Sequence, residues 1–343
     1  PIQGAELCSI VELMYSYEIL FSITGNIKWL DHLEMLAYNS LPAAVSPDMW
    51  THQYDQMINQ VASFPMSKQP FRTNNNEAHL FGLEPHFGCC TSNFGQGFPK
   101  LALSTFFKTE KGIASCVLSP SVIETEINGV KVMCELVTEY PFRGTLKYII
   151  KTDAPVRFSM AVRIPSFAKS AEIDKAEMKC GEFAEISREW DGRTEIEVNI
   201  DFETEIVNRP ENMVCVRRGA LIYSIPIKEK WEKVEYTKDG VKRKYPYCDY
   251  YIYPQSKWNY ALTSNEFEVS EQEFDAPFNP EHPPVTLTAE LIEIEWGFNC
   301  GHCDRLPKST ESLSDIQKIK LFPYGCTNLR MTEIPFVYKN HFM

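Results

Sequence analysis

The chain has 343 residues, 44% of them hydrophobic, which is enough to bury two or three separate cores. Its formal net charge of −12 argues against a nucleic acid or an anionic membrane surface as a partner. We find no apolar run that approaches the roughly 20 residues of a membrane span, so we expect no membrane partner either.

Residues 1–40 have the pattern of helices. Ser9 opens a capping box with a glutamate three residues later, which predicts that a helix begins at Ser9. Apolar residues then recur at helical spacing as far as Gly25, a residue type that commonly ends helices. The pattern predicts one helix over about 9–23 and a second over about 28–39.

Residues 41–92 are rich in proline, asparagine, glutamine and turn residues, which predicts a long active-site loop region, because unstructured loops of this length are usually functional. Within it, Trp50 and Tyr54 can form a stacking wall for a sugar ring or simply pack the loop. His52 and His86 can hydrogen-bond a sugar hydroxyl, although a lone loop histidine is more often a surface residue. These four are our candidate substrate-binding residues.

Two pairs of residues carry the ligand types of a zinc site. Glu6 and Cys8 stand two residues apart near the start of the chain, and Cys89 and Cys90 are adjacent. If the pairs meet in space, three sulfurs and one oxygen make a complete tetrahedral set for zinc. Spacing alone does not bring them together, so small buried cysteines in a hydrophobic core remain the alternative.

The surroundings of both pairs predict loops that enter helices, and helix N-termini favour thiolate over thiol. Pro99 indicates that regular helix after the cysteine pair begins only near Gly97, and apolar spacing carries it to about Lys108. Both halves of the expected site would then lie on loops just before a helix.

Strand signals dominate after residue 110. Asn128-Gly129 between two alternating runs is a strong signal for a two-residue hairpin turn. Short alternating strands with frequent turns, among them Val214–Ile225, predict a β-sandwich. We expect an α + β multidomain chain in three parts: a helical part over 1–110, a β-sandwich over 111–227 and a second, smaller β-rich unit over 228–343.

A second cysteine motif, Cys300-Gly301-His302-Cys303, has the sequence of a redox-active dithiol. Such a dithiol needs a helix directly after its first cysteine, and Pro307 makes an extended helix there doubtful. A structural zinc site with Cys326 would need a fourth ligand, for which His302 is a candidate. Two ordinary thiols are the default interpretation.

Several stretches resemble the glycoside hydrolase family 127 group, the β-L-arabinofuranosidase-like proteins. The Gly-Cys-Cys-x-x-Asn element that begins at Gly88 is the most specific of them, and the likeness runs along nearly the whole chain. The similar stretches are 49–56, 84–100, 218–224, 254–260 and 323–330.

The resemblance implies a zinc ion held by Glu6, Cys8, Cys89 and Cys90, with Cys89 as the nucleophile. The implied reaction is retaining hydrolysis of β-L-arabinofuranosides or related plant-glycan sugars through a thioglycosyl intermediate. The implied fold places the C-terminal helices of an (α/α)6 barrel in residues 1–110, followed by β-sandwich domains.

The family's general acid/base is a glutamate upstream of the Glu-x-Cys motif, and no residue of this sequence matches it. Glu77 and Glu84 are the carboxylates nearest to Cys89 in sequence, and both have the pattern of solvated loop acids. We therefore expect the chain to be the C-terminal part of a longer enzyme and to be inactive by itself.

Two functional classes stay open on the sequence: this glycosidase, and a noncatalytic carbohydrate-binding or structural β-sandwich protein with structural cysteines. Either would have a carbohydrate partner, and a homodimer is left open. The 11 cysteines, an odd number, favour a reducing compartment such as the cytoplasm.

Overall fold

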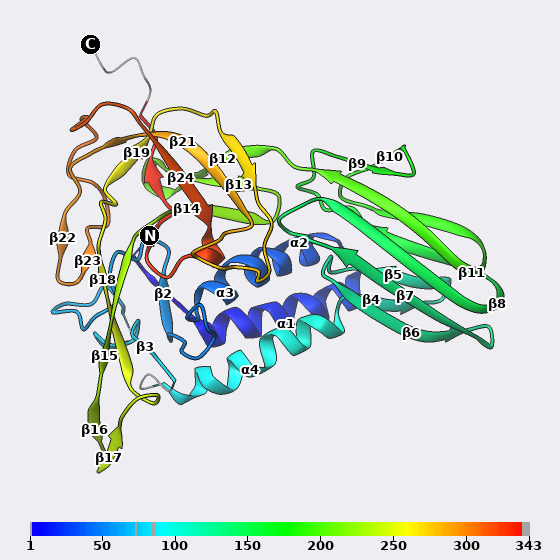
Figure 1. The fold of residues 1–343 in the computed structure, drawn as a ribbon, viewed down its shortest axis with the longest axis horizontal. Coiled ribbons are helices and arrows are strands. Elements are labelled where there is room, and N and C mark those ends of the chain that lie inside the picture. The colour runs from blue at the N-terminus through cyan, green and yellow to red at the C-terminus, as the bar shows by residue number, and fades with distance from the viewer. Residues whose placement is uncertain (1, 73, 84–86, 338–343) are drawn as a thin grey trace.

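The computed structural model describes residues 2–72, 74–83 and 87–337. Strands are the largest class of regular structure, and the helices are gathered beside two large sheets (Figure 1). The helices are α1 (Leu7–Thr24), α2 (Lys28–Met35), a π-helical turn (Leu36–Ser40), α3 (Leu41–Ala43) and α4 (Gly88–Leu103), with 3-10 turns at Pro210–Asn212 and Tyr324–Cys326.

Helix α1 begins at Leu7, two residues earlier than predicted. Its N-cap is Glu6, without a capping hydrogen bond from that side chain, so the expected capping box at Ser9 is wrong. The Leu7 amide instead donates to the Tyr54 carbonyl at 2.8 Å, and the Leu7 side chain is fully buried, so tertiary contacts fix the start. The predicted end is confirmed: Gly25 is left-handed (φ 63°) and its amide donates to the Phe21 carbonyl.

Helix α4 begins at Gly88, well before the predicted start near Gly97, and it contains Pro99. It lies along α1, and a Cβ on Gly97 would approach Val11 and Leu41 at 3.3–3.4 Å. This close packing on α1 stabilises the helix upstream of the proline. As a result, Cys8 and Cys89 lie in first helical turns rather than on loops.

The segment between α3 and α4 has little regular structure, as predicted, yet much of it is buried, unlike most loops. Residues near the end of the chain satisfy some of its polar groups: Gln60 and Arg330 exchange backbone hydrogen bonds, and the Asn59 side-chain amide donates to the Glu333 carbonyl. Short strands also form here: β1 (Gly4–Glu6) pairs with β2 (Asp55–Met57).

An eight-stranded sheet follows, centred on a long hairpin of β8 and β11 with a register shift between Trp190 and Gly192. The first half of β8 pairs with β7, and the second half pairs in parallel with β5. The predicted turn at Asn128-Gly129 is confirmed between β6 and β7. The strands are β4 (Phe106–Thr109), β5 (Gly112–Ser115), β6 (Ser121–Ile127), β7 (Val130–Thr138), β8 (Thr145–Arg163), β9 (Ser170–Ile173), β10 (Ala176–Met178) and β11 (Phe183–Asp201).

A nine-stranded sheet contains the strand predicted over Val214–Ile225, which the sequence pattern assigns to the preceding sandwich. The backbone of β14 pairs with β24 and β25, so the change of sheet falls at residues 202–203 rather than at 227. Its strands are β12 (Thr204–Arg209), β13 (Met213–Arg218), β14 (Leu221–Pro226), β19 (Tyr260–Leu262), β20 (Glu268–Glu271), β21 (Val285–Glu293), β24 (Gln317–Pro323), β25 (Arg330–Met331) and β26 (Ile334–Pro335).

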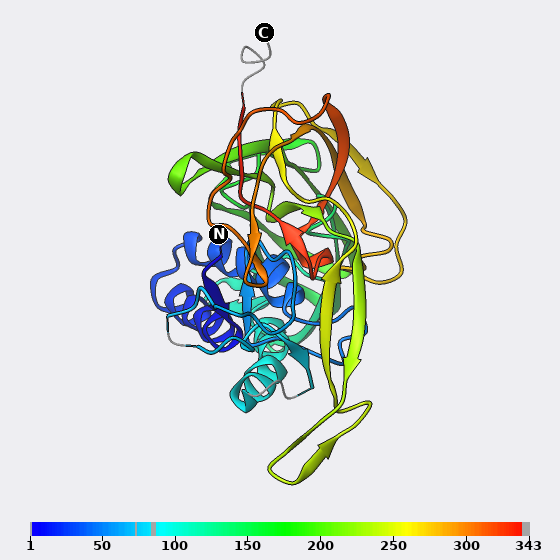
Figure 2. The same ribbon diagram turned by 90° about the vertical axis from the view of Figure 1, so that its left-hand side faces the viewer.

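A long hairpin stands beside the helices and projects beyond the rest of the molecule (Figures 1 and 2). The middle of the hairpin, at Asp249 and Tyr250, pairs with β3, and the Trp50 indole donates to the Pro246 carbonyl just before β18. The elements are β3 (Phe81–Gly82), β15 (Glu229–Val234), β18 (Asp249–Pro254) and, at the tip, β16 (Tyr236–Lys238) with β17 (Val241–Arg243).

The Cys300–Cys303 motif forms a tight hairpin turn between β22 (Phe298–Asn299) and β23 (His302–Cys303). Cys300 and Gly301 both have positive φ, 58° and 92°, as a primed hairpin turn requires. No helix follows the first thiol, so the redox interpretation is wrong. Cys303 is fully buried with its sulfur 3.8 Å from the Asn59 carbonyl, in keeping with an ordinary core thiol.

A buried ion network fastens the helices to the eight-stranded sheet. Arg163 of β8 is fully buried and contacts Asp31 at 2.6 Å and Glu34, both on α2. The Tyr140 hydroxyl donates to the other oxygen of Glu34 at 2.5 Å. Because each charge has a partner away from water, the network ties α2 firmly to β8.

Helix α1 is long and apolar enough to pass a simple test for a membrane span, although the sequence pattern predicted no such run. Its 18 residues have a mean hydropathy of 1.3, and by length and composition alone they suffice to cross a membrane. Core helices of globular proteins pass the same test, and one face of α1 is buried here.

Candidate metal–thiolate site

The two cysteine groups meet although 81 residues separate Cys8 from Cys89 in the sequence. The sulfurs of Cys8, Cys89 and Cys90 all lie within 4.8 Å of one another, and those of Cys8 and Cys90 are 3.3 Å apart. Helices α1 and α4 run side by side with their N-terminal ends at the same end of the helical layer (Figure 1), which brings their first turns together.

The three thiols differ in exposure. Cys90 is fully buried, Cys8 is half-buried and Cys89 is exposed. Burial raises the pKa of Cys90 and of Cys8, while a hydrogen bond from the Asn93 side chain lowers the pKa of Cys8. Without a positive charge nearby, the two less exposed thiols would therefore stay protonated at neutral pH.

The thiol triad has the dimensions of a soft-metal site. Zinc–sulfur bonds of about 2.3 Å place the sulfurs of a tetrahedral site roughly 3.8 Å apart. The Cys8 and Cys90 sulfurs are 3.3 Å apart and both lie within 4.8 Å of the Cys89 sulfur, so a small shift would bring the three to that spacing. A bound cation would also explain why Cys8 and Cys90, whose ionisation burial opposes, are gathered beside a third thiol.

Glu6 is not among the described ligand atoms that lie within 4.8 Å of one another. Its backbone is the N-cap of α1, two residues before Cys8, and its carboxylate is hydrogen-bonded to Tyr54. Burial first, and this carboxylate second, raise the pKa of the Tyr54 hydroxyl. Glu6 as a metal ligand therefore stays a prediction.

Tyr54 and His52 lie beside the first turns of α4. The Tyr54 ring stacks on Phe87 with centroids 4.1 Å apart. His52 Nε2 is 3.4 Å from the Thr91 hydroxyl, and its ring is parallel to Phe94 at 6.3 Å. Burial lowers the pKa of His52 to about 4, so the imidazole is neutral at pH 7.

The other candidates are not gathered at the thiols in the same way. Trp50 is 41% exposed, and its indole N–H donates to the Pro246 carbonyl at 2.9 Å. Glu77 faces the long hairpin: burial chiefly raises the pKa of Tyr236 and of Tyr251, and the Glu77 charge adds to both shifts. His86 and Glu84 lie outside the described residues.

Two polar residues near the site were missed as individual candidates. Asn93 hydrogen-bonds Cys8, and its only sequence signal was its place in the Gly-Cys-Cys-x-x-Asn element. Asp55 is 2% exposed and lies opposite Glu6 in the β1–β2 pair. Burial raises the pKa of Asp55 to about 6, and no local pattern marks this residue.

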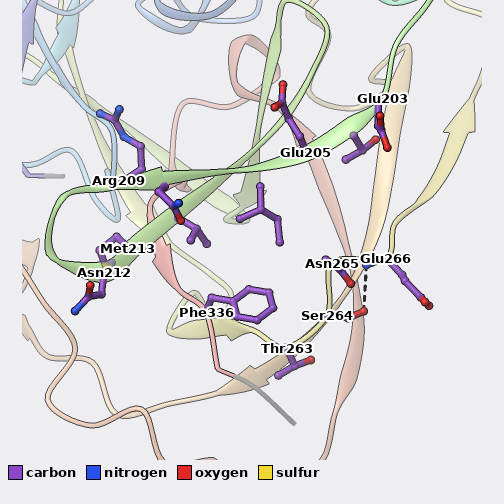
Figure 3. A pocket seen from close by; sticks show the side chains of 14 residues that line it. Glu203, Glu205, Arg209, Asn212, Met213, Thr263, Ser264, Asn265, Glu266 and Phe336 are labelled. Atoms are coloured by element: carbon purple, nitrogen blue, oxygen red, sulfur yellow. Dashed lines mark hydrogen bonds between the residues drawn. The ribbon is translucent and has the colours of Figure 1, made fainter. Parts of the chain in front are cut away.

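A groove of about 1090 Å³ lies elsewhere, on the nine-stranded sheet (Figure 3). It is open and polar, with Phe336 and Met213 among its few apolar side chains, and Ser264 accepts a hydrogen bond from the Glu266 amide within it. None of its lining residues belongs to the thiol site, so it takes no part in the chemistry of the three thiols.

Comparison with known families agrees with this arrangement. Residues 1–103 match the family model described as "Beta-L-arabinofuranosidase, GH127 catalytic domain", and residues 112–202 match "Beta-L-arabinofuranosidase, GH127 middle domain". Together the two models cover more than half of the chain, in sequence order. No curated protein sequence matches this chain.

Solved structures share the fold at low sequence identity. A GH127 β-L-arabinofuranosidase from Geobacillus stearothermophilus T6, Ara127N-Se, superposes with a TM-score of 0.69 at 17% identity, over 97% of this chain and 50% of that one. "The GH127, Beta-arabinofuranosidase, BT3674" gives 0.67 at 18% identity, over 97% and 50%. The chain therefore spans about half the length of these relatives, and both domain models show that it belongs to glycoside hydrolase family 127.

Proposed function

We propose that this chain is part of a retaining glycoside hydrolase that acts on β-L-arabinofuranosides or related plant-glycan sugars. The observation that carries the proposal is the convergence of Cys8, Cys89 and Cys90 from two helix starts, within the segment that matches the GH127 catalytic domain. Two of the similar solved structures are a β-L-arabinofuranosidase and a β-arabinofuranosidase, which supports this class of substrate.

Cys89 is the nucleophile in this proposal. A nucleophile must reach the anomeric carbon of the sugar, and Cys89 is the exposed thiol of the three. Cys90 is fully buried and can only serve as a ligand, while Cys8 is half-buried in the first turn of α1. In this proposal the exposed sulfur attacks the sugar, and the two less exposed sulfurs act as ligands.

Cys8, Cys89 and Cys90 would hold a zinc ion, with Glu6 supplying an oxygen ligand. When bound, the ion supplies positive charge that keeps the thiols deprotonated despite their burial. The Asn93 amide hydrogen-bonds the Cys8 sulfur and favours its thiolate. The Glu6 carboxylate hydrogen-bonds the Tyr54 hydroxyl, and the Tyr54 ring lies against Phe87, the residue just before α4.

The reaction has two steps. The Cys89 thiolate forms a bond to the anomeric carbon while the bond to the leaving oxygen breaks, and a general acid protonates that oxygen. Water then attacks the thioglycosyl carbon, the carbon–sulfur bond breaks, and the thiolate is restored as a base takes the proton of the water. We assign no residue of this chain as the acid/base, because the family's glutamate has no match here.

The helical layer is part of a larger barrel of paired helices in the whole enzyme, as the resemblance implies. Support comes from the outer face of α1, where apolar side chains lack cover: Ile23 is 74% exposed, and Leu13 and Ile19 are each 42% exposed. Exposed apolar side chains of this kind are typical of a helix surface that packs against further structure.

The nucleophile is tested by labelling. A mechanism-based β-L-arabinofuranosyl inhibitor, applied to the whole enzyme that contains this sequence, should attach to Cys89, as peptide mass spectrometry would show. Cys89→Ser should lose the label, while Cys300→Ser, which removes an exposed thiol far along the chain, should keep it. A label on a carboxylate would refute the assignment.

A further inference from the structure

One short strand contacts both halves of the thiol site. The Tyr54 carbonyl, just before β2, accepts a hydrogen bond from the Leu7 amide at the start of α1, and Asp55, the first residue of β2, lies directly opposite Glu6. The Tyr54 ring stacks on Phe87, the residue just before α4. The dipeptide Tyr54-Asp55 therefore touches the segment that carries Cys8 and the segment that carries Cys89 and Cys90.

The Asp55 carboxylate is held from several sides. It is 2% exposed and accepts a hydrogen bond of 2.5 Å from the Asn74 amide. A Cβ on Gly4 would lie 2.7 Å from its Cγ, so β1 can pass here only because position 4 lacks a side chain. The Asp55 amide donates to the Ala78 carbonyl at 2.8 Å, which fixes the backbone as well.

We propose that Asp55 is a positioning residue that sets the place of β1, and through it of Glu6 and Cys8, relative to Cys89 and Cys90. The proposal rests on the proposed metal–thiolate function. Nothing in the thiol group itself fixes the distance between the two helix starts, whereas a pinned carboxylate packed under Gly4 does. A displaced β1 would move Glu6 directly and Cys8 through the first turn of α1.

The test compares zinc affinity with thermal stability in the 343-residue chain. Asp55→Ala removes the support under Gly4, and Gly4→Ala forces the strand off the carboxylate, so both should weaken zinc binding about tenfold or more in a chelator competition. Asp55→Asn keeps the shape and can still accept from Asn74, so its affinity should stay within about threefold of wild type. Ser224→Ala, a buried polar change in the nine-stranded sheet, controls for general loss of stability.

A metal-free measurement separates this inference from the function on which it rests. Diamide oxidises two nearby thiols to a disulfide, and the Cys8 and Cys90 sulfurs are 3.3 Å apart. Peptide mapping should show this disulfide forming several-fold more slowly in Asp55→Ala than in wild type or Asp55→Asn. Failure of wild type to bind zinc, with this rate difference intact, would defeat the proposed metal site alone.

The positioning role would be overturned by either of two results. In the first, Asp55→Ala lowers the melting temperature but keeps both zinc affinity and the disulfide rate. In the second, Asp55→Asn loses as much as Asp55→Ala, because charge rather than shape would then be the contribution of this residue.

Discussion

Three thiols at the starts of α1 and α4 differ sharply in burial, and the proposed metal site depends on that difference. Cys90 is fully buried, contacts Cys8, and has its pKa raised chiefly by burial. A buried thiol of this kind is inert unless a cation compensates its ionisation. The adjacent Cys89, by contrast, is open to solvent, so neighbouring positions in one helical turn have different roles.

Purified wild-type chain should contain about one zinc ion, and Cys90→Ser should contain much less, because a buried hydroxyl is a poorer zinc ligand than a thiolate. Elemental analysis of the two proteins would measure this. Cys134→Ser, which alters a buried thiol in the sheet, is the matched control and should keep its zinc. Well-folded wild type that holds no metal would contradict the site.

Stability at acid pH should depend on His52. Its pKa is lowered to about 4 by burial, so the unfolded chain binds this proton between about pH 6.5 and 4 while the folded chain does not. Above pH 6.5 the protonation of His52 takes nothing from the free energy of unfolding. As the pH drops toward 4, the unfolded chain gains the proton and the free energy of unfolding falls. Between pH 7 and 4.5 the free energy of unfolding should therefore fall by about 2–3 kcal/mol less in His52→Gln than in wild type.

Urea unfolding at the two pH values would measure the difference. Asp55, with its pKa raised to about 6, makes the free energy of unfolding rise as the pH drops. Because both proteins contain Asp55, the comparison isolates the contribution of His52. Equal losses of the free energy of unfolding in wild type and His52→Gln would show that the imidazole is not kept neutral by burial.

At the scale of elements, local sequence signals were reliable where the chain itself makes the contacts. Gly25 ends α1, and Asn128-Gly129 turns a hairpin, because both need only the backbone freedom of one or two residues. The predicted starts of α1 and α4 were wrong because distant contacts fix both. The Tyr54 carbonyl accepts the Leu7 amide at the start of α1, and Gly97 lets α4 pack closely on α1.

The candidate site shows the same division. Residue types and the Gly-Cys-Cys-x-x-Asn element were enough to name three converging thiols. Asp55 and Asn93 act through contacts across strands or helices, and no periodicity of the sequence records such contacts. The sequence pattern assigned Val214–Ile225 to the wrong sheet for the same reason, because β14 pairs with strands about 100 residues away.

The attachment of α2 to the eight-stranded sheet depends on a charge cluster, which gives an element-scale prediction. Glu34→Ala should destabilise the fold by about 3–5 kcal/mol, because it leaves the fully buried Arg163 short of a countercharge. Chemical unfolding would measure this. Glu195→Ala removes an exposed partner of Lys147 and should cost far less than Glu34→Ala, because solvent screens an exposed ion pair. Similar small losses in both variants would show that the network contributes little.

At the scale of the whole molecule, helices and sheets behave as one interlocked body. The buried segment after α3 takes its hydrogen bonds from residues near the end of the nine-stranded sheet, as the pairing of Gln60 with Arg330 and of Asn59 with Glu333 shows. The proposed division into parts over 1–110, 111–227 and 228–343 therefore describes sequence segments that depend on one another for polar satisfaction.

The activity of this chain alone is the last expectation to test. Attack by Cys89 needs a proton donor on the leaving-group side, and general acid help is worth about 10²–10⁴-fold. The chain spans about half the length of its solved relatives, and the family's acid glutamate has no match in it. Hydrolysis of an aryl β-L-arabinofuranoside by the 343-residue chain should therefore be at least about 100-fold slower than by the whole enzyme.

Release of the aryl group, followed by absorbance, would measure both rates, with Cys89→Ser as the background in each protein. An activated aryl leaving group needs little protonation, so any residual rate should be higher on it than on an alkyl β-L-arabinofuranoside. Turnover of the alkyl substrate by the chain at the rate of the whole enzyme would mean that a carboxylate present here acts as the acid. Glu77→Gln would then be the first variant to make, and Asp55→Asn the next, because Asp55 lies beside Glu6 with its pKa raised to about 6.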